Sequence, residues 1–155
     1  MQFSSKEDIE APIDAVFREI TDFQSFERSA LRRGAEVRRT DTRDEPGVGM
    51  SWHARFVLRG RRRDLDIDLV EYDVPNGIAI EARSPALLGH MRVDLVALSR
   101  GRTRLSVDLA LEPRSISGRL MVQSLKLARN NLTKRFRLRV ADYAVDLEDR
   151  YKRNA

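Results

Sequence analysis

The chain has 155 residues, of which 41% are hydrophobic, and carries a formal net charge of +5. A chain of this length and composition can bury one core, so we expect a single domain over residues 1–155. It has no cysteine, which excludes disulfides, zinc–thiolate sites and cysteine nucleophiles, and its two histidines are too few for a typical metal site. We therefore expect neither a metal nor another cofactor.

The sequence also limits location and partners. It has no run of about 18 apolar residues, and its first residues, MQFSSKEDIEAP, lack the apolar stretch of a signal peptide. We therefore expect a cytoplasmic protein. A positive net charge is one sign of an anionic partner. However, 25 of the 29 basic residues are arginine, a skew that the codon usage of a GC-rich genome also produces.

A short amphipathic helix is expected after an N-terminal strand. In the segment APIDAVFREITDF, Pro12 suits the first turn of a helix. The apolar residues that follow, Ile13, Val16, Phe17 and Ile20, recur at helical spacing and define its buried face.

A second short helix follows directly. Asp22 can cap it, Phe23, Phe26 and Leu31 supply its inner face, and Gly34 ends it. Helix-turn-helix readers of DNA also place two short helices in series. The strands that follow here, and the aromatic side chains on the inner face, argue against that class.

The segment FVLRGRRRDLDIDL, residues 56–69, sets four arginines and three aspartates around Gly60. We expect Gly60 and Arg61 to be the central residues of a type II′ turn in an antiparallel hairpin. The resulting register pairs Phe56 with Leu65, Ala54 with Ile67 and Trp52 with Leu69 on an apolar side, and Arg55 with Asp66 and His53 with Asp68 on a charged side. The arginines are thus better explained as a solvated hairpin than as a phosphate-binding patch, and His53 as a surface pair than as a base.

The same alternation continues downstream. Turn residues at 75–77 precede a strand in which Ile78, Ile80 and Ala82 share one side. A further hairpin across Arg100 and Gly101 places Met91, Val93 and Leu95 opposite Leu109, Val107 and Leu105, with Arg92 opposite Asp108 on the outer side. Repeated alternation of this kind predicts an antiparallel sheet with one solvated face.

A long helix is expected over residues 115–150. Its apolar stripe has members three and four residues apart: Met121, Leu125, Ala128, Leu132, Phe136, Val140, Tyr143 and Leu147. At about 1.5 Å per residue this helix is longer than a small sheet is wide, so we expect its C-terminal end to bend or project.

The back of this helix is basic. Between Glu112 and Asp142 there is no acidic residue and there are eight basic ones. In projection, three basic residues and three leucines fall on two lines beside the buried stripe: Arg119, Lys126 and Arg137, and Leu120, Leu127 and Leu138. Either the leucines are merely exposed, or the two rows meet an anionic membrane surface, a partner protein or a second copy of the chain. Nucleic acid is less well matched, because no row of exposed aromatic residues is present for stacking.

This order of elements resembles the START-like, or polyketide cyclase/dehydrase-like, superfamily, also known as SRPBCC or Bet v 1-like. The resemblance rests on IEAPIDAVFREITDFQSF at residues 9–26, on GVGMSWHARF at residues 47–56, and on the closing helix. It implies an α+β helix-grip fold, in which a curved antiparallel sheet of six or seven strands grips the long helix. It also implies an apolar cavity that takes a lipid, a polyketide or another hydrophobic molecule.

The inward positions of the sheet and helix give the candidate ligand contacts. They are Trp52, Phe56, Ile67, Leu69, Ile80, Met91, Met121, Leu125 and Ala128. The alternative is that each is an ordinary core residue. Met91 and Met121 stand out, because a flexible thioether adapts to varied ligands.

Catalytic groups are scarce. Glu71 is placed on the inward register of its strand, where burial would raise its pKa, and His90 is placed in a loop at the cavity mouth. The alternatives are a carboxylate in water at the sheet end and an exposed loop histidine. No nucleophile triad, phosphate loop or dinucleotide fingerprint is present.

Three functions follow from these observations. The first is a non-enzymatic binding or carrier protein for a small hydrophobic molecule, the second a cyclase or dehydratase, and the third an interaction module that uses the basic helix at a membrane surface or partner protein. A cavity lined by carbon favours the carrier over the enzyme, and a filled core favours the interaction module.

Overall fold

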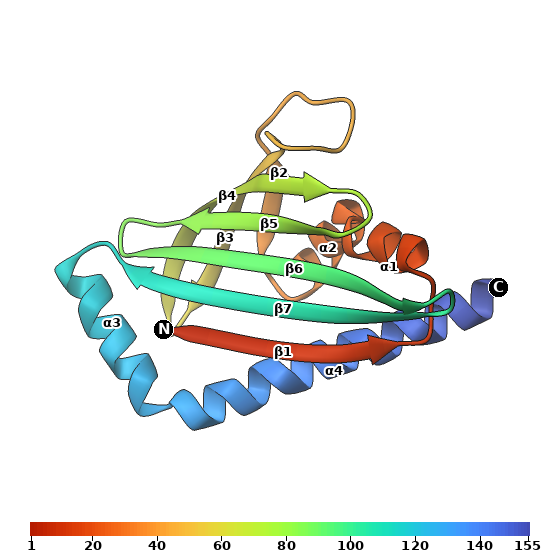
Figure 1. Ribbon diagram of the computed structural model, residues 1–155. Coiled ribbons are helices and arrows are strands. Elements are labelled where there is room, and N and C mark those ends of the chain that lie inside the picture. Colours follow the sequence, from red (N-terminus) through yellow and green to blue (C-terminus); the bar gives the residue numbers. More distant parts are fainter.

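The computed structural model describes residues 1–155 as seven strands and four helices (Figure 1). The strands are β1 (Gln2–Ile9), β2 (Glu36–Arg39), β3 (Ser51–Leu58), β4 (Arg61–Asp73), β5 (Gly77–Arg83), β6 (Leu87–Ser99) and β7 (Arg102–Pro113). The helices are α1 (Ile13–Ile20), α2 (Phe23–Arg32), α3 (Ile116–Leu127) and α4 (Arg129–Asn154).

All seven strands form one antiparallel sheet in the order β1-β7-β6-β5-β4-β3-β2. Strands β2 to β7 are a meander in which each strand pairs with the next, and β1 joins the far edge by pairing with β7. The sheet curves over one side of α4, with α1 and α2 at one end and α3 at the other (Figure 1). This is the expected α+β helix-grip fold.

The two short helices form as the sequence predicts. The apolar spacing of α1 buries Val16, Phe17 and Ile20 against the sheet. The Asp22 carboxylate accepts a hydrogen bond from the backbone N–H of Ser25, 3.2 Å away, and so caps α2. Leu31 is exposed rather than on the inner face of α2, so that part of the prediction is wrong.

The register of the β6–β7 hairpin is confirmed, with Met91 opposite Leu109 and Leu95 opposite Leu105. In the β3–β4 hairpin the turn lies one residue earlier than predicted. Its central residues are Arg59 and Gly60, whose φ angles of 53° and 74° are both positive, as a type I′ turn requires.

The earlier turn changes the partners across β3 and β4 but not the faces. Trp52 lies opposite Ile67 and His53 opposite Asp66, each two residues from the predicted partner. A shift of two residues preserves the alternation of a strand, so the apolar side still faces inward and the charged side outward.

The expected single C-terminal helix is two helices. The backbone leaves α-helical geometry at Ala128, with φ −101° and ψ 15°, and α4 runs off in a new direction (Figure 1). The two helices pack on different parts of the sheet: α3 lies against β7, whereas α4 lies along β1. The bend therefore occurs near the start of the predicted helix rather than at its C-terminal end.

The core divides into a filled part and a hollow part. Ile9, Val16, Leu69 and Leu147 are almost completely enclosed. Burying each of these side chains stabilises the fold by about 1.5–3 kcal/mol.

No helix of the structure is both long enough and apolar enough to span a bilayer.

Candidate functional site

The hollow part of the core is a cavity of about 450 Å³ between the sheet, α2 and α4. Of its 18 lining residues, 16 are hydrophobic. They come from the sheet (Val37, Trp52, Ile67, Ile78, Ile80, Met91, Val93, Leu105, Val107), from α1 and α2 (Ile20, Phe23, Phe26, Glu27, Ala30) and from α4 (Phe136, Arg139, Val140, Tyr143). The walls are therefore almost entirely carbon.

Four of the residues selected from the sequence line this cavity: Trp52, Ile67, Ile80 and Met91. Each lies on the inward side of its strand, as the alternation predicts. Their contact with a ligand stays a prediction.

The other selected sheet residues lie outside the cavity wall. Leu69 also points inward, but it is only 1% exposed and belongs to the filled core. Phe56 is half-buried near the end of β3 and does not reach the cavity.

The three selected helix residues also lie outside. Met121 and Leu125 are half-buried on α3, and Ala128 is exposed at the bend. The bend at Ala128 carries α3 away from the cavity, so only the part of the apolar stripe that lies on α4 covers it. The sequence pattern runs through the bend without a break, because Leu125, Ala128 and Leu132 keep helical spacing.

The main residues missing from the selection come from the two covering helices. Phe23, Phe26 and Ala30 of α2, and Phe136 and Tyr143 of α4, close the side of the cavity that faces away from the sheet. The sequence did mark four of these five residues as inward-facing. Phe23 and Phe26 lie on the apolar face of α2, and Phe136 and Tyr143 lie on the apolar stripe of α4. The sequence pattern does not indicate which part of a stripe covers a filled core and which part covers a space.

Trp52 organises one wall of the cavity. Its indole N–H donates a hydrogen bond to the Glu27 carboxylate, 2.8 Å away, and its ring packs on Phe23 with a centroid distance of 5.2 Å. The guanidinium of Arg39 lies 5.7 Å from the centre of the same ring. These contacts connect α2 to β3 and fix the orientation of the indole.

Only two charged residues line the cavity, Glu27 and Arg139. Glu27 is engaged by Trp52, whereas Arg139 is exposed and forms no ion pair with any carboxylate of the chain. The Tyr143 hydroxyl is buried without a hydrogen-bond partner, and burial raises the pKa of this phenol far above its usual value. This hydroxyl has almost no accessible surface, so it does not face the cavity.

The two candidate catalytic residues are not in the cavity. A β-bulge between Leu69 and Glu71 turns Glu71 to the outer face, where Arg92 binds its carboxylate through two hydrogen bonds of 2.8 Å. Arg92 lowers the pKa of Glu71, the opposite of the predicted direction.

The predicted location of His90 is also wrong. It lies in strand β6 rather than in a loop, opposite Glu81, and its side chain is exposed. Because Met91 points into the cavity, its neighbour His90 must point to the outer face. The inside of the molecule thus holds neither of the proposed acid–base groups.

Solved structures share this fold. TTHA0849 from Thermus thermophilus aligns over 100% of this chain and 99% of its own, with 16% identity and a TM-score of 0.66. The Zhui aromatase/cyclase from a Streptomyces species aligns over 97% and 95%, with 14% identity and a TM-score of 0.68. A START superfamily protein from Mycobacterium smegmatis aligns over 86% and 95%, with 14% identity and a TM-score of 0.55. These likenesses establish the fold.

No curated protein matches the chain in a sequence search. The family described as polyketide cyclase/dehydrase and lipid transport matches residues 1–146, nearly the whole chain. This match shows that the chain belongs to the polyketide cyclase/dehydrase and lipid transport family.

Proposed function

We propose that the protein binds and carries a small hydrophobic molecule in the cavity between the sheet, α2 and α4. The observation that carries this proposal is the lining, in which 16 of 18 residues are hydrophobic. A volume of about 450 Å³ is within the range of small-molecule sites. An apolar molecule entering this space removes its own surface and that of the lining from water, which favours binding by about 25 cal/mol per Å².

The unpaired Arg139 supports a more specific ligand class. A guanidinium at the rim of an apolar cavity can bind a carboxylate or another anionic oxygen group, while the apolar body of the ligand fills the space behind it. The ligand that matches both features is an amphipathic molecule with an anionic end, such as a fatty acid.

Trp52 provides the test, because it is the only tryptophan of the chain and lines the cavity. Titration with a long-chain fatty acid should change Trp52 fluorescence and reach saturation. Ile80→Phe, which fills part of the cavity, should weaken this binding by roughly tenfold, equivalent to about 1.4 kcal/mol. Val57→Phe, at an exposed position of β3, is the matched control and should bind like the wild type.

Native mass spectrometry of the purified protein would identify a molecule that copurifies with it. A wild-type protein that carries nothing and whose Trp52 fluorescence does not respond to hydrophobic compounds would contradict the proposal.

A cyclase or dehydratase is the second candidate. The observation in its favour is that the polar side chains of Glu27 and Arg139 line the same cavity, where the guanidinium could polarise a carbonyl group. Mass spectrometry of a bound polyketide after incubation separates the candidates. A carrier returns the molecule unchanged, a dehydratase returns a product that has lost water, and a cyclase returns an isomer of the same mass that chromatography separates from the substrate.

A further inference from the structure

Helix α3 presents an apolar surface to solvent. The side chains of Ile116, Leu120 and Leu127 are 80%, 63% and 92% exposed. They lie on one side of the helix, while Gly118 and Val122 face the rest of the protein. Isolated exposed leucines are common, but a continuous apolar patch marks an interaction surface. Three exposed apolar residues on one helical stripe form such a patch.

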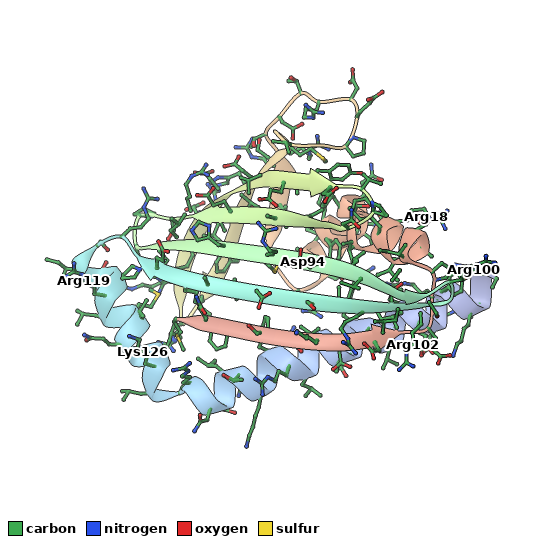
Figure 2. The ribbon with its side chains drawn as sticks, in the orientation of Figure 1. Arg18, Asp94, Arg100, Arg102, Arg119 and Lys126 are labelled. Atoms are coloured by element: carbon green, nitrogen blue, oxygen red, sulfur yellow. The ribbon has the colours of Figure 1, made fainter.

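Basic residues accompany this stripe. Arg119 and Lys126 lie beside it on α3, at the opposite end of the molecule from Arg18 and Arg100 (Figure 2). No acidic residue occurs between Glu112 and Asp142, so no carboxylate of this stretch neutralises the patch.

The sequence pattern also included Leu138 in this surface, but the structure separates it. Leu138 lies on α4, beyond the bend at Ala128, so it no longer continues the line of Leu120 and Leu127. The docking surface is therefore defined by α3 alone, as Ile116, Arg119, Leu120, Lys126 and Leu127.

A second copy of the chain is a poor partner for this surface. In a two-fold dimer the same patch meets itself, so α3 would lie against α3. Arg119 and Lys126 of both copies would then lie at one interface, without any acidic residue of the patch to compensate. Such an arrangement is electrostatically unfavourable.

We propose that α3 docks the protein on an anionic lipid membrane. The apolar stripe enters the boundary between headgroups and acyl chains, and Arg119 and Lys126 bind the anionic headgroups, as in amphipathic helices that lie in the membrane interface. The proposal does not depend on which molecule occupies the cavity, because α3 does not line it.

The first experiment is flotation with vesicles of phosphatidylcholine alone or with added phosphatidylglycerol. The wild type should float with the anionic vesicles only, and high salt should release it, because salt screens the attraction. Wild-type protein that ignores anionic vesicles would overturn the proposal.

Two pairs of variants locate the contact. Arg119→Gln with Lys126→Gln should weaken binding by about fivefold for each charge removed, and Arg18→Gln with Arg100→Gln, which removes the same charge at the opposite end, should not. Leu120→Ser with Leu127→Ser should also lose binding, whereas Val96→Ser with Leu98→Ser, exposed residues of β6, should keep it.

Equal losses in a variant pair and its control would show that overall charge or apolarity, not α3, causes the binding.

Sedimentation of the same proteins tests whether a second copy of the chain occupies the surface instead. A wild-type dimer that Leu120→Ser with Leu127→Ser converts to a monomer would assign the surface to a second copy and overturn the membrane proposal. Circular dichroism of each variant confirms that it is folded.

Discussion

At the residue scale, Arg139 differs from the rest of the cavity wall. It is the only charged residue of the cavity wall without a partner, and its guanidinium is free to meet an anionic group of a ligand. Leu69, by contrast, shares the inward register but does not line the cavity, because core side chains already surround it. The inward direction of a side chain is therefore not sufficient to make it a contact.

Arg139→Gln should reduce the affinity for a fatty acid by about tenfold, because a charge-assisted hydrogen bond to a carboxylate contributes roughly 1.5–3 kcal/mol and this one is partly screened by solvent. The affinity for the matching fatty alcohol should stay nearly constant. Titrations followed by Trp52 fluorescence measure both. An equal loss for acid and alcohol would mean that Arg139 supports the cavity wall rather than the anionic end of the ligand.

His53 makes the hairpin sensitive to pH. Its ring nitrogens lie 2.9 Å from the Asp66 carboxylate and 3.0 Å from that of Asp64, and hydrogen bonds to these two groups raise the pKa of His53. Arg55 also binds Asp64 on the same face. Because the folded protein favours the protonated ring, this contribution to stability is complete below the ordinary histidine pKa of about 6.5 and is lost as the pH rises through the raised value.

The melting temperature should therefore fall modestly as the pH rises from the ordinary histidine pKa through the raised pKa of His53, and His53→Gln should remove that part of the decrease. His90→Gln is the control, because His90 forms no ion pair, and it should keep the wild-type dependence. A His53→Gln protein with an unchanged pH profile would contradict the role assigned to the Asp64 and Asp66 pairs.

At the scale of elements, Gly118 fixes the position of α3. A Cβ atom at this residue would lie 2.0 Å from the carbonyl oxygen of Ala86, in the turn between β5 and β6. Only glycine permits this approach of the helix to the turn. The Ser115 hydroxyl caps the same end of α3 by accepting a hydrogen bond from the Gly118 N–H, 3.0 Å away.

Gly118→Ala should lower the free energy of unfolding by about 1–3 kcal/mol, because the backbone must shift to relieve the clash. Gly101→Ala provides the comparison, since nothing lies within 4 Å of a Cβ atom there, and it should change stability by less than about 0.5 kcal/mol. Urea unfolding measures both. Equal stabilities of the two variants would show that α3 is not held by this contact.

Helix α2 differs from α1 in how it is held. No residue of α2 is fully buried, and its main side-chain contacts beyond the helix are those of Phe23 and Glu27 with Trp52, and of Phe26 with Tyr143. The ring centroids of Phe26 and Tyr143 are 5.9 Å apart, and both residues line the cavity. Of the four helices, α2, which covers the cavity together with α4, therefore has the fewest buried residues.

At the scale of the molecule, the cavity results from the way in which the helices α1, α2 and α4 cover one face of the sheet. The filled core includes residues of β1, α1 and the C-terminal part of α4, where Ile9, Val16 and Leu147 meet. The hollow part lies where α2 and the middle of α4 span the sheet without filling it, although aromatic residues such as Phe26 and Phe136 line it.

The fold class, the two short helices and the inward position of Trp52, Ile67, Ile80 and Met91 could be predicted from the sequence. These features depend on alternation, helical spacing and capping, which are local properties and can be read from neighbouring residues. Even the misplaced turn at Arg59 and Gly60 left the inward face unchanged, because the error moved the register by two residues.

Which inward residues enclose a space, and where the C-terminal helix bends, could not be predicted from the sequence. Leu69 and Ile80 are directly opposite each other on β4 and β5 and look alike in sequence, yet one is core and the other lines the cavity. The bulge before Glu71 and the bend at Ala128 likewise interrupt patterns that continue without a break in the sequence. A periodic pattern states which way a side chain points, but what it meets there depends on how distant elements pack.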